Sequence, residues 1–244
     1  MLVKSKGWGL IILILTLLPS FLWTNEAAYL LQSGIDSFLS GSINEAADIL
    51  NEVGSDYANS ELIRSRSKLW LGRVAIGGGD VETAERFLSE SASLAASAGL
   101  SFERSNGNNK NLAEAYRVNA DALAEIMLFK GVPYIIKNGG KVQELAEKSL
   151  ANDPGNPDAA VIYAQGRINA PRLFGGNRNE GISILSDLWL NRLDGNLSKA
   201  QIFRVAVALG DTYLKKDPDK AEEYYYQAAL LFPDNQYIKN RTTN

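Results

Sequence analysis

The sequence between residues 67 and 98 reads SKLWLGRVAIGGGDVETAERFLSESASLAASA. It contains two runs of apolar residues at helical spacing, divided by Gly77-Gly78-Gly79-Asp80. Three consecutive glycines interrupt a helix, because glycine loses more backbone entropy on ordering than any other residue. Asp80 is a favourable N-cap for the second run, since its carboxylate can accept hydrogen bonds from backbone N–H groups. The stretch therefore predicts an antiparallel helical hairpin.

Small residues recur at matching positions of this hairpin and of the one before it. Gly72 and Ala84 stand twelve positions apart, and so do Gly34 and Ala46 upstream. Small residues at the contact allow two helices to cross closely. With Leu71 directly before Gly72, the pattern resembles the tetratricopeptide repeat (TPR), in which each repeat is one helical hairpin.

The resemblance extends over residues 25–238. It implies an all-α fold, a TPR-like α-α superhelix of about five antiparallel helical hairpins. The apolar periodicity places these hairpins at residues 25–53, 60–98, 111–150, 156–190 and 198–232. The close crossings are then expected at Gly34, Ala46, Gly72, Ala84, Gly210 and Ala221. The alternative is an ordinary helical bundle with glycine-rich turns.

Three segments are expected to lie outside these helices. Residues 99–110 are polar and rich in glycine and asparagine, which predicts a mobile surface linker. Residues 131–140 are apolar for a loop, and either contact a partner or fold back onto the array, which is the favoured reading. Residues 235–244 are polar and are predicted to fray.

The composition excludes several kinds of chemistry. The 244-residue chain has a net charge of −3 with both signs interspersed, which argues against a nucleic-acid partner. It contains no cysteine and no histidine, which excludes disulfides, thiolate nucleophiles and imidazole-based catalysis or metal ligation. Asp121 and Glu125 could form a carboxylate pair, but a solvated helix face is the more common explanation of this spacing. We therefore expect no enzymatic activity and assign no cofactor.

The first 24 residues differ from the rest. Two lysines precede an apolar run from Trp8 to Leu18, a pattern typical of a secretory signal peptide. Further apolar residues up to Trp23 bring the run close to spanning length, and no small-x-small cleavage motif stands out. We divide the chain into a signal peptide or membrane anchor (1–24) and a helical repeat domain (25–244). Export is expected, with the domain periplasmic or tethered facing the periplasm.

The fourth hairpin carries a more specific pattern. Ala170-Pro171 is followed by Gly175-Gly176-Asn177 between its two helices. This connector resembles one in exported bacterial repeat proteins, such as the T component of tripartite ATP-independent periplasmic (TRAP) transporters. The resemblance covers residues 157–190. It implies an accessory transporter component that binds or passes a small ligand and docks a periplasmic solute-binding protein.

In three of the five hairpins, arginines occupy positions of the first helix that are expected to line the concave groove of a TPR array. The candidate binding surface consists of Arg66, Arg73, Asp121, Glu125, Tyr163, Arg167, Arg204 and Asp211. The planar guanidinium group suits carboxylates. The arginines are therefore expected either to bind an acidic group of a peptide or small ligand, or to pair with Asp121, Glu125 and Asp211 and hold neighbouring hairpins together.

Two functions follow from these patterns. The fold alone supports a non-enzymatic interaction scaffold whose partner is a protein or peptide of the bacterial cell envelope. The resemblance of the fourth hairpin implies instead the transporter accessory, with a carboxylated or hydrophobic small ligand. Membrane contact is expected only through the N-terminal segment, and self-association is left open.

Overall fold

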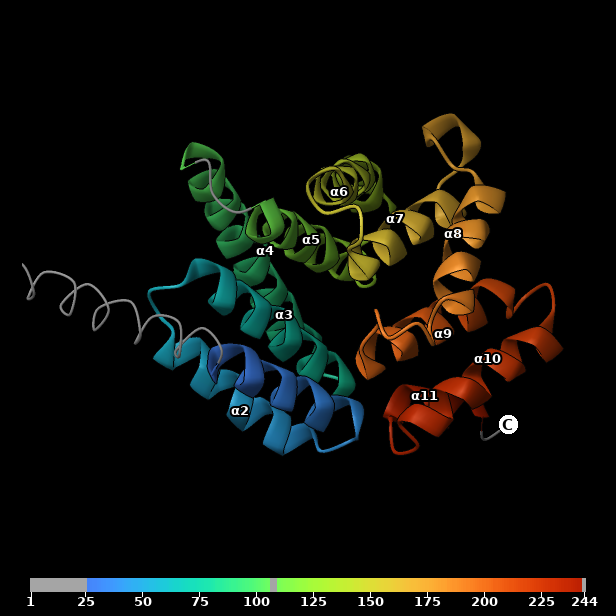
Figure 1. The fold of residues 1–244 in the computed structure, drawn as a ribbon, viewed down its shortest axis with the longest axis horizontal. Helices are drawn as coiled ribbons and strands as arrows, with labels where there is room; N and C mark the ends of the chain where they lie inside the picture. Colours follow the sequence, from blue (N-terminus) through green and yellow to red (C-terminus); the bar gives the residue numbers. More distant parts are fainter. Residues whose placement is uncertain (1–25, 106–108, 243–244) are drawn as a thin grey trace, which may run out of the picture.

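The computed structural model describes residues 26–105 and 109–242, which form helices and turns and contain no strand (Figure 1). A helix over residues 26–39 comes first. It is followed by α2 (Ile43–Asp56), α3 (Glu61–Gly77), α4 (Val81–Arg104), α5 (Asn109–Ile126), α6 (Val132–Asn152), α7 (Pro157–Asn169), the 3-10 helix η1 (Arg172–Phe174), α8 (Arg178–Leu190), α9 (Lys199–Tyr213), α10 (Pro218–Leu231) and α11 (Gln236–Thr242). Within this part of the chain, helix 26–39 pairs with α2, α3 with α4, α5 with α6, α7 with α8 and α9 with α10. The predicted five hairpins are confirmed.

N-cap and first-turn residues set where several of the helices begin. The Asp80 carboxylate accepts a hydrogen bond from the Thr83 backbone N–H at 3.0 Å, as predicted for the N-cap of α4. Ser198 and Gln201 form a reciprocal capping box at the start of α9. Pro218 lies in the first turn of α10, where its missing N–H costs no helical hydrogen bond. Local sequence therefore already specifies where these three helices begin.

The close helix crossings occur at the predicted small residues. All six are buried: Gly34, Ala46, Gly72, Ala84, Gly210 and Ala221. A Cβ atom added at Gly72 would lie 2.7 Å from Cγ of Leu88, and one at Gly34 would lie 2.9 Å from Cγ of Leu50. Each glycine thus makes room for a large side chain of the facing helix, and the predicted register is confirmed.

Helix α4 is longer than the sequence indicated. It continues to Arg104, and α5 already begins at Asn109, so the prediction of a linker at residues 99–110 was wrong at both of its ends. Ala98 and Gly99 are buried, and a Cβ at Gly99 would contact Ala115 of α5 at 3.9 Å. Packing against α5 therefore extends a helix whose own sequence favours it only weakly. Residues 106–108 of the predicted linker lie outside the described part.

Helix α6 also begins earlier than expected, because residues 132–140 are helical and not a loop. Tyr134 packs against the core cluster that contains Leu69 and Leu88. Ile135 and Ile136 remain exposed, so the favoured reading, in which this segment folds back, was right for Tyr134 only.

The C-terminal tail forms helix α11, where fraying was predicted. Ile238 is buried, and the Asn235 side-chain oxygen accepts hydrogen bonds from the backbone N–H groups of Tyr237 and Ile238. The segment is polar overall, so its composition did not indicate that one apolar residue is buried and that an asparagine caps the helix. Residues 243–244 lie outside the described part.

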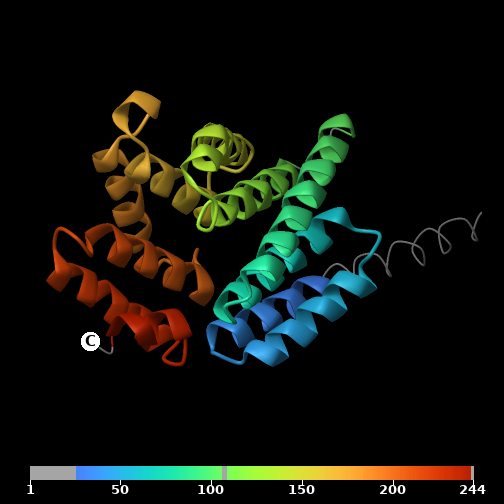
Figure 2. The same ribbon diagram turned by 180° about the vertical axis from the view of Figure 1, so that it is seen from behind.

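The two ends of the array meet. The Asn235 amide nitrogen donates a hydrogen bond to the Leu39 carbonyl oxygen at 3.1 Å, across 196 positions of sequence. One core cluster joins Leu31 of helix 26–39 with Phe203 and Phe232 from the last hairpin. Figures 1 and 2 both show α11 beside the turn that follows helix 26–39. The superhelix is therefore closed and not open-ended.

We expect Asn235→Ala to release α11 and to destabilise the closed array by about 1–2 kcal/mol, the usual loss of a helix cap and a buried hydrogen bond. Amide hydrogen exchange should become faster in α11 and at the turn after helix 26–39. Asn240→Ala is the matched control, because Asn240 is exposed on α11. Equal amide hydrogen exchange rates in the two variants would contradict the proposed role of Asn235 in joining the two ends of the array.

Candidate functional site

Charged side chains gather between the first helices of the second to fifth hairpins. These are α3, α5, α7 and α9, whose arrangement Figure 1 shows. We define the inner charge network as Arg66, Arg73, Glu114, Arg117, Asp121, Glu125, Asp158 and Arg204. It holds four arginines and four carboxylates, so the formal charges within it cancel.

Asp121 is the centre of this network. Its Oδ2 atom accepts hydrogen bonds from Arg73 of α3 and Arg117 of α5, each at 2.9 Å. Its Oδ1 atom accepts one from Arg204 of α9 at 2.6 Å. Asp121 is only 3% exposed, so these contacts replace water almost completely. One carboxylate therefore joins three helices that are far apart in sequence.

The remaining members extend these contacts to α7. Arg204 also donates to Asp158 of α7 at 3.0 Å, and the Gln201 side chain donates to the same carboxylate at 2.9 Å. On α5, Arg117 forms a paired contact with both Glu114 oxygens at 2.7 Å. Arg66 of α3 adds an ion pair to Glu114 at 3.0 Å. The network thus bridges all four inner helices.

These contacts shift the titration of the carboxyl groups. Burial opposes the ionised form of Asp121, but the three neighbouring guanidinium groups outweigh it and hold the pKa of Asp121 well below its ordinary value. Burial likewise opposes ionisation of Asp158 and Glu114, whose pKa values are nevertheless lowered, mainly by Arg204 and Arg117 respectively. These carboxylates therefore stay charged at neutral pH.

Glu125 behaves differently, although it lies one turn from Asp121 on α5. Its Oε1 atom accepts a hydrogen bond from Arg73 at 2.7 Å, while its Oε2 atom is buried without a hydrogen-bond partner. Burial, assisted by the negative charge of Asp121, raises the pKa of Glu125 despite the contact with Arg73. Glu125 is thus the carboxylate that the network stabilises least.

We expect Glu125→Gln to have little effect on stability near pH 4.5 and below, because the amide mimics the protonated carboxyl group that burial favours. A carboxyl group whose pKa is raised on folding stabilises the protein below its unfolded value, here 4.5, and loses that contribution as the pH rises through the folded value. Relative to Glu125→Gln, the wild type should therefore lose stability as the pH is raised from 4.5 towards neutrality. Urea unfolding over this pH range measures the difference in the free energy of unfolding. A wild type that becomes more stable relative to Glu125→Gln as the pH rises would contradict this expectation.

The structure divides the predicted surface into three groups. Arg66, Arg73 and Arg204 pair with Glu114, Asp121, Glu125 and Asp158 in the inner charge network, so the expectation that arginines hold hairpins together is confirmed for Asp121 and Glu125. Tyr163 and Arg167 form a second group. Their side chains both donate to Glu180 of α8, at 3.1 and 3.0 Å, within the fourth hairpin.

Asp211 is the third group, and its expected pairing with arginine was wrong. It accepts hydrogen bonds from the hydroxyl groups of Tyr225 and Tyr237, each at 2.6 Å. Burial and the contact with Asp211 raise the pKa of Tyr237 to about 12. Asp211 therefore connects α9 with α10 and α11.

Sequence reasoning missed Glu114, Arg117 and Asp158. Glu114, Arg117 and Asp121 follow one another on α5 at spacings of three and four residues, which places them on one helix face. That alternation of signs was visible in the sequence and could have indicated a paired network. Nothing local indicated Asp158, whose partner Arg204 lies 46 positions away.

The connector between α7 and α8 is a compact, internally bonded loop. Gly175 has a φ of +84°, and a Cβ on Gly176 would clash with the Ala170 carbonyl oxygen, so both positions require glycine. The Arg167 side chain donates to the Gly175 carbonyl oxygen and closes the loop. At its tip, Leu173 is 88% exposed and Phe174 is 68% exposed.

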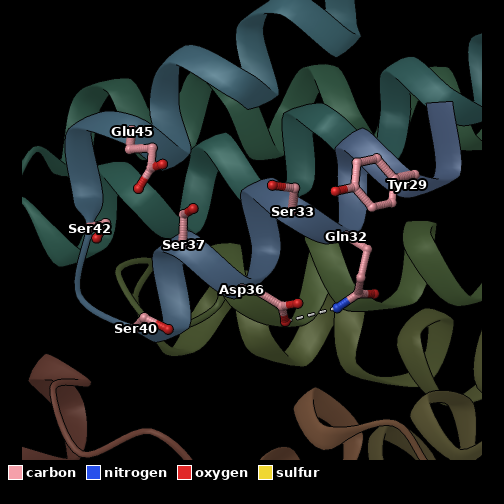
Figure 3. Close-up of a pocket in the computed structure, with 8 residues that line it drawn as sticks. All are labelled: Tyr29, Gln32, Ser33, Asp36, Ser37, Ser40, Ser42 and Glu45. Atoms are coloured by element: carbon pink, nitrogen blue, oxygen red, sulfur yellow. Dashed lines mark hydrogen bonds between the residues drawn. The ribbon is translucent and has the colours of Figure 1, made fainter. Parts of the chain in front are cut away.

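Two open depressions lie outside the inner charge network. One lies beside the connector and includes Arg167, Arg172 and Arg178 in its lining. The other follows the exposed face of helix 26–39 into the start of α2 (Figure 3). Its lining is mostly hydroxyl and carboxyl groups, namely Tyr29, Gln32, Ser33, Asp36, Ser37, Ser40, Ser42 and Glu45, with a hydrogen bond from Gln32 to Asp36 at 3.0 Å.

Among the described residues, no group of three or more acidic side chains is placed to hold a metal ion. None of the described helices combines the length and the apolar character needed to cross a bilayer.

The fold is similar to that of a thermophilic TPR protein of Thermus thermophilus. The TM-score is 0.56 at 13% sequence identity, over 89% of this chain and 97% of that chain. No family model and no curated protein matches the sequence. The chain thus has a TPR-like helical repeat fold, as its hairpin pattern predicted.

Proposed function

We propose that the chain is a non-enzymatic TPR-type scaffold that holds protein partners in the bacterial cell envelope. The observation that carries this proposal is the connector between α7 and α8. It presents Leu173 and Phe174 to solvent on a loop whose backbone is fixed by its own hydrogen bonds. Large apolar side chains on a preorganised loop lose little entropy on binding and are typical anchors of protein interfaces.

The inner charge network argues against partner binding in the concave groove of the array and in favour of binding at exposed surfaces. Arg73 and Arg204 already pair with carboxylates of the chain itself, and the charges in the network cancel. An acidic ligand would have to displace Asp121, which is bound by three arginines. We therefore assign partner binding to the connector.

The test is photo-crosslinking in the intact envelope, with a photoreactive amino acid at Leu173 of the full chain. A partner should crosslink at this position and not at Glu222, an exposed control position on α10. The double substitution Leu173→Ser with Phe174→Ser should abolish co-purification of that partner, since both side chains are exposed and the fold does not depend on them. Crosslinking no different from that at Glu222 would overturn the proposal.

A second candidate is the accessory T component of a TRAP-type transporter. It is favoured by the same connector, whose Ala170-Pro171 and Gly175-Gly176-Asn177 resemble that type of protein. The identity of the crosslinked protein separates the two candidates. A periplasmic solute-binding protein or a transporter subunit would support the transporter role, and assembly or secretion proteins would support the general scaffold.

A further inference from the structure

The turn between α5 and α6 carries a concentrated group of exposed apolar side chains. We define the α5–α6 patch as Leu128, Val132, Ile135 and Ile136. Val132, Ile135 and Ile136 fall at helical positions i, i+3 and i+4, so they share one face of the first turn of α6. Leu128 and Ile136 are 75% and 68% exposed, which is unusual for such residues within nine positions of sequence.

The packing of neighbouring aromatic residues sets the orientation of the patch. Phe129 and Tyr134 pack inward, against the cluster that contains Leu88 and Ile126. The α6 turn is therefore anchored by these two rings, and its opposite face points to solvent. The apolar residues of the patch are consequently not available to the core of this chain.

Within the segment that carries the patch, the charged residues are all lysines. Residues 126–143 contain Lys130, Lys137 and Lys141 and no aspartate or glutamate. Lys130 forms an ion pair with Glu85 of α4 at 2.6 Å, which holds it at the edge of the patch. A small apolar face bordered by lysines is complementary to an anionic lipid surface, where the apolar groups enter the headgroup region and the ammonium groups meet lipid phosphates.

The composition of the patch suits a bilayer. Exposed apolar side chains flanked by lysines combine insertion into the headgroup region with attraction to anionic lipid. A bilayer needs no complementary shape, and a weak contact suffices when a second element holds the protein near the surface. The sequence offers such an element, because an apolar run ends at Trp23, three positions before helix 26–39 begins.

We propose that the α5–α6 patch docks the array onto an anionic membrane surface. This contact is additional to the expected N-terminal tether and fixes the orientation of the array on the bilayer. Since no described helix is suited to spanning, the contact is interfacial. It goes beyond the scaffold function and uses a surface separate from the α7–α8 connector.

The absence of native cysteine allows a site-specific test. The full chain carrying Ile136→Cys is labelled with a polarity-sensitive fluorophore and reconstituted with vesicles of phosphatidylcholine, with or without phosphatidylglycerol. We expect a blue shift and quenching by brominated lipid in the vesicles that contain phosphatidylglycerol. The label at Leu230→Cys, an exposed position of α10, should stay water-like. Lys137→Gln with Lys141→Gln should remove the response at position 136.

Three results would overturn the proposal. The first is a label at position 136 that stays water-like while the protein floats with anionic vesicles, which would mean that the tether alone binds. The second is an equal response at positions 136 and 230, which shows unspecific adsorption. The third is a response to polyglutamate but not to vesicles, which would assign the patch to an acidic protein. Circular dichroism of each variant confirms that the fold is intact.

Discussion

Asp121→Asn is expected to lower the free energy of unfolding by about 3–5 kcal/mol, the usual cost of removing one partner from a buried ion pair. The substitution keeps the shape of the side chain but leaves Arg73, Arg117 and Arg204 facing a neutral group. The network would then hold four arginines against three carboxylates in a region from which water is largely excluded. A decrease of about 6–20 °C in melting temperature is expected for a chain of this size.

The control is Asp194→Asn, which removes the same charge from an exposed loop position. The pH dependence provides a second check. The pKa of Asp121 lies far below its ordinary value of 3.8, so its contribution is fully present above that pH and is lost as the pH falls through the folded value. The penalty of Asp121→Asn should therefore be constant near neutrality and shrink in strong acid. Equal melting temperatures for the two variants would show that Asp121 does not join the helices.

Gly72→Leu is expected to destabilise the protein by about 1–3 kcal/mol through overpacking. The Leu88 side chain occupies the space next to Gly72 and is itself completely buried, so it cannot move aside without disturbing its cluster. The crossing of α3 and α4 would have to widen. Thermal unfolding of the purified variant measures the effect.

Gly139→Leu is the matched control for this substitution. Gly139 also lies inside a helix, α6, but a Cβ there would meet nothing within 4 Å. Replacing a helical glycine in open space should be neutral or slightly stabilising, because leucine has the higher helix propensity by about 0.5–1 kcal/mol. Similar losses in both variants would mean that glycine is required for its backbone and not for the helix crossing.

The hairpins could be predicted because their signals are local. Triple glycine and Asp80 mark a turn and a cap, and the spacing of Gly72 and Ala84 marks a crossing within a single hairpin. The same logic failed where a helix depends on a different hairpin. α4 passes through Gly99 because α5 covers it, and α11 forms because Ile238 and Asn235 reach the other end of the chain.

The candidate site also combines features encoded within single hairpins with features that depend on contacts between hairpins. The spacing of inner positions predicted that Arg66, Arg73, Asp121, Glu125 and Arg204 lie on the inner helices, and the structure brings these residues together. The spacing left open whether the arginines pair with these carboxylates or bind a ligand, since this depends on how strongly the superhelix curls. Arg204 reaches Asp121 across 83 positions, and no pattern in a single hairpin encodes that distance.

The meeting of Leu39 and Asn235 has a consequence for how this chain can change over time. In an open solenoid each repeat contacts only its neighbours, so a repeat can be gained or lost near either end. Here the first and last hairpins share one core, and the Gly41 turn lies against the Asp234 backbone. Duplicating a hairpin would separate the surfaces of the first and last hairpins, which now bury each other. Deleting a hairpin would also prevent these two surfaces from meeting. The number of hairpins is therefore constrained by packing, in the same way as the size of a buried core side chain.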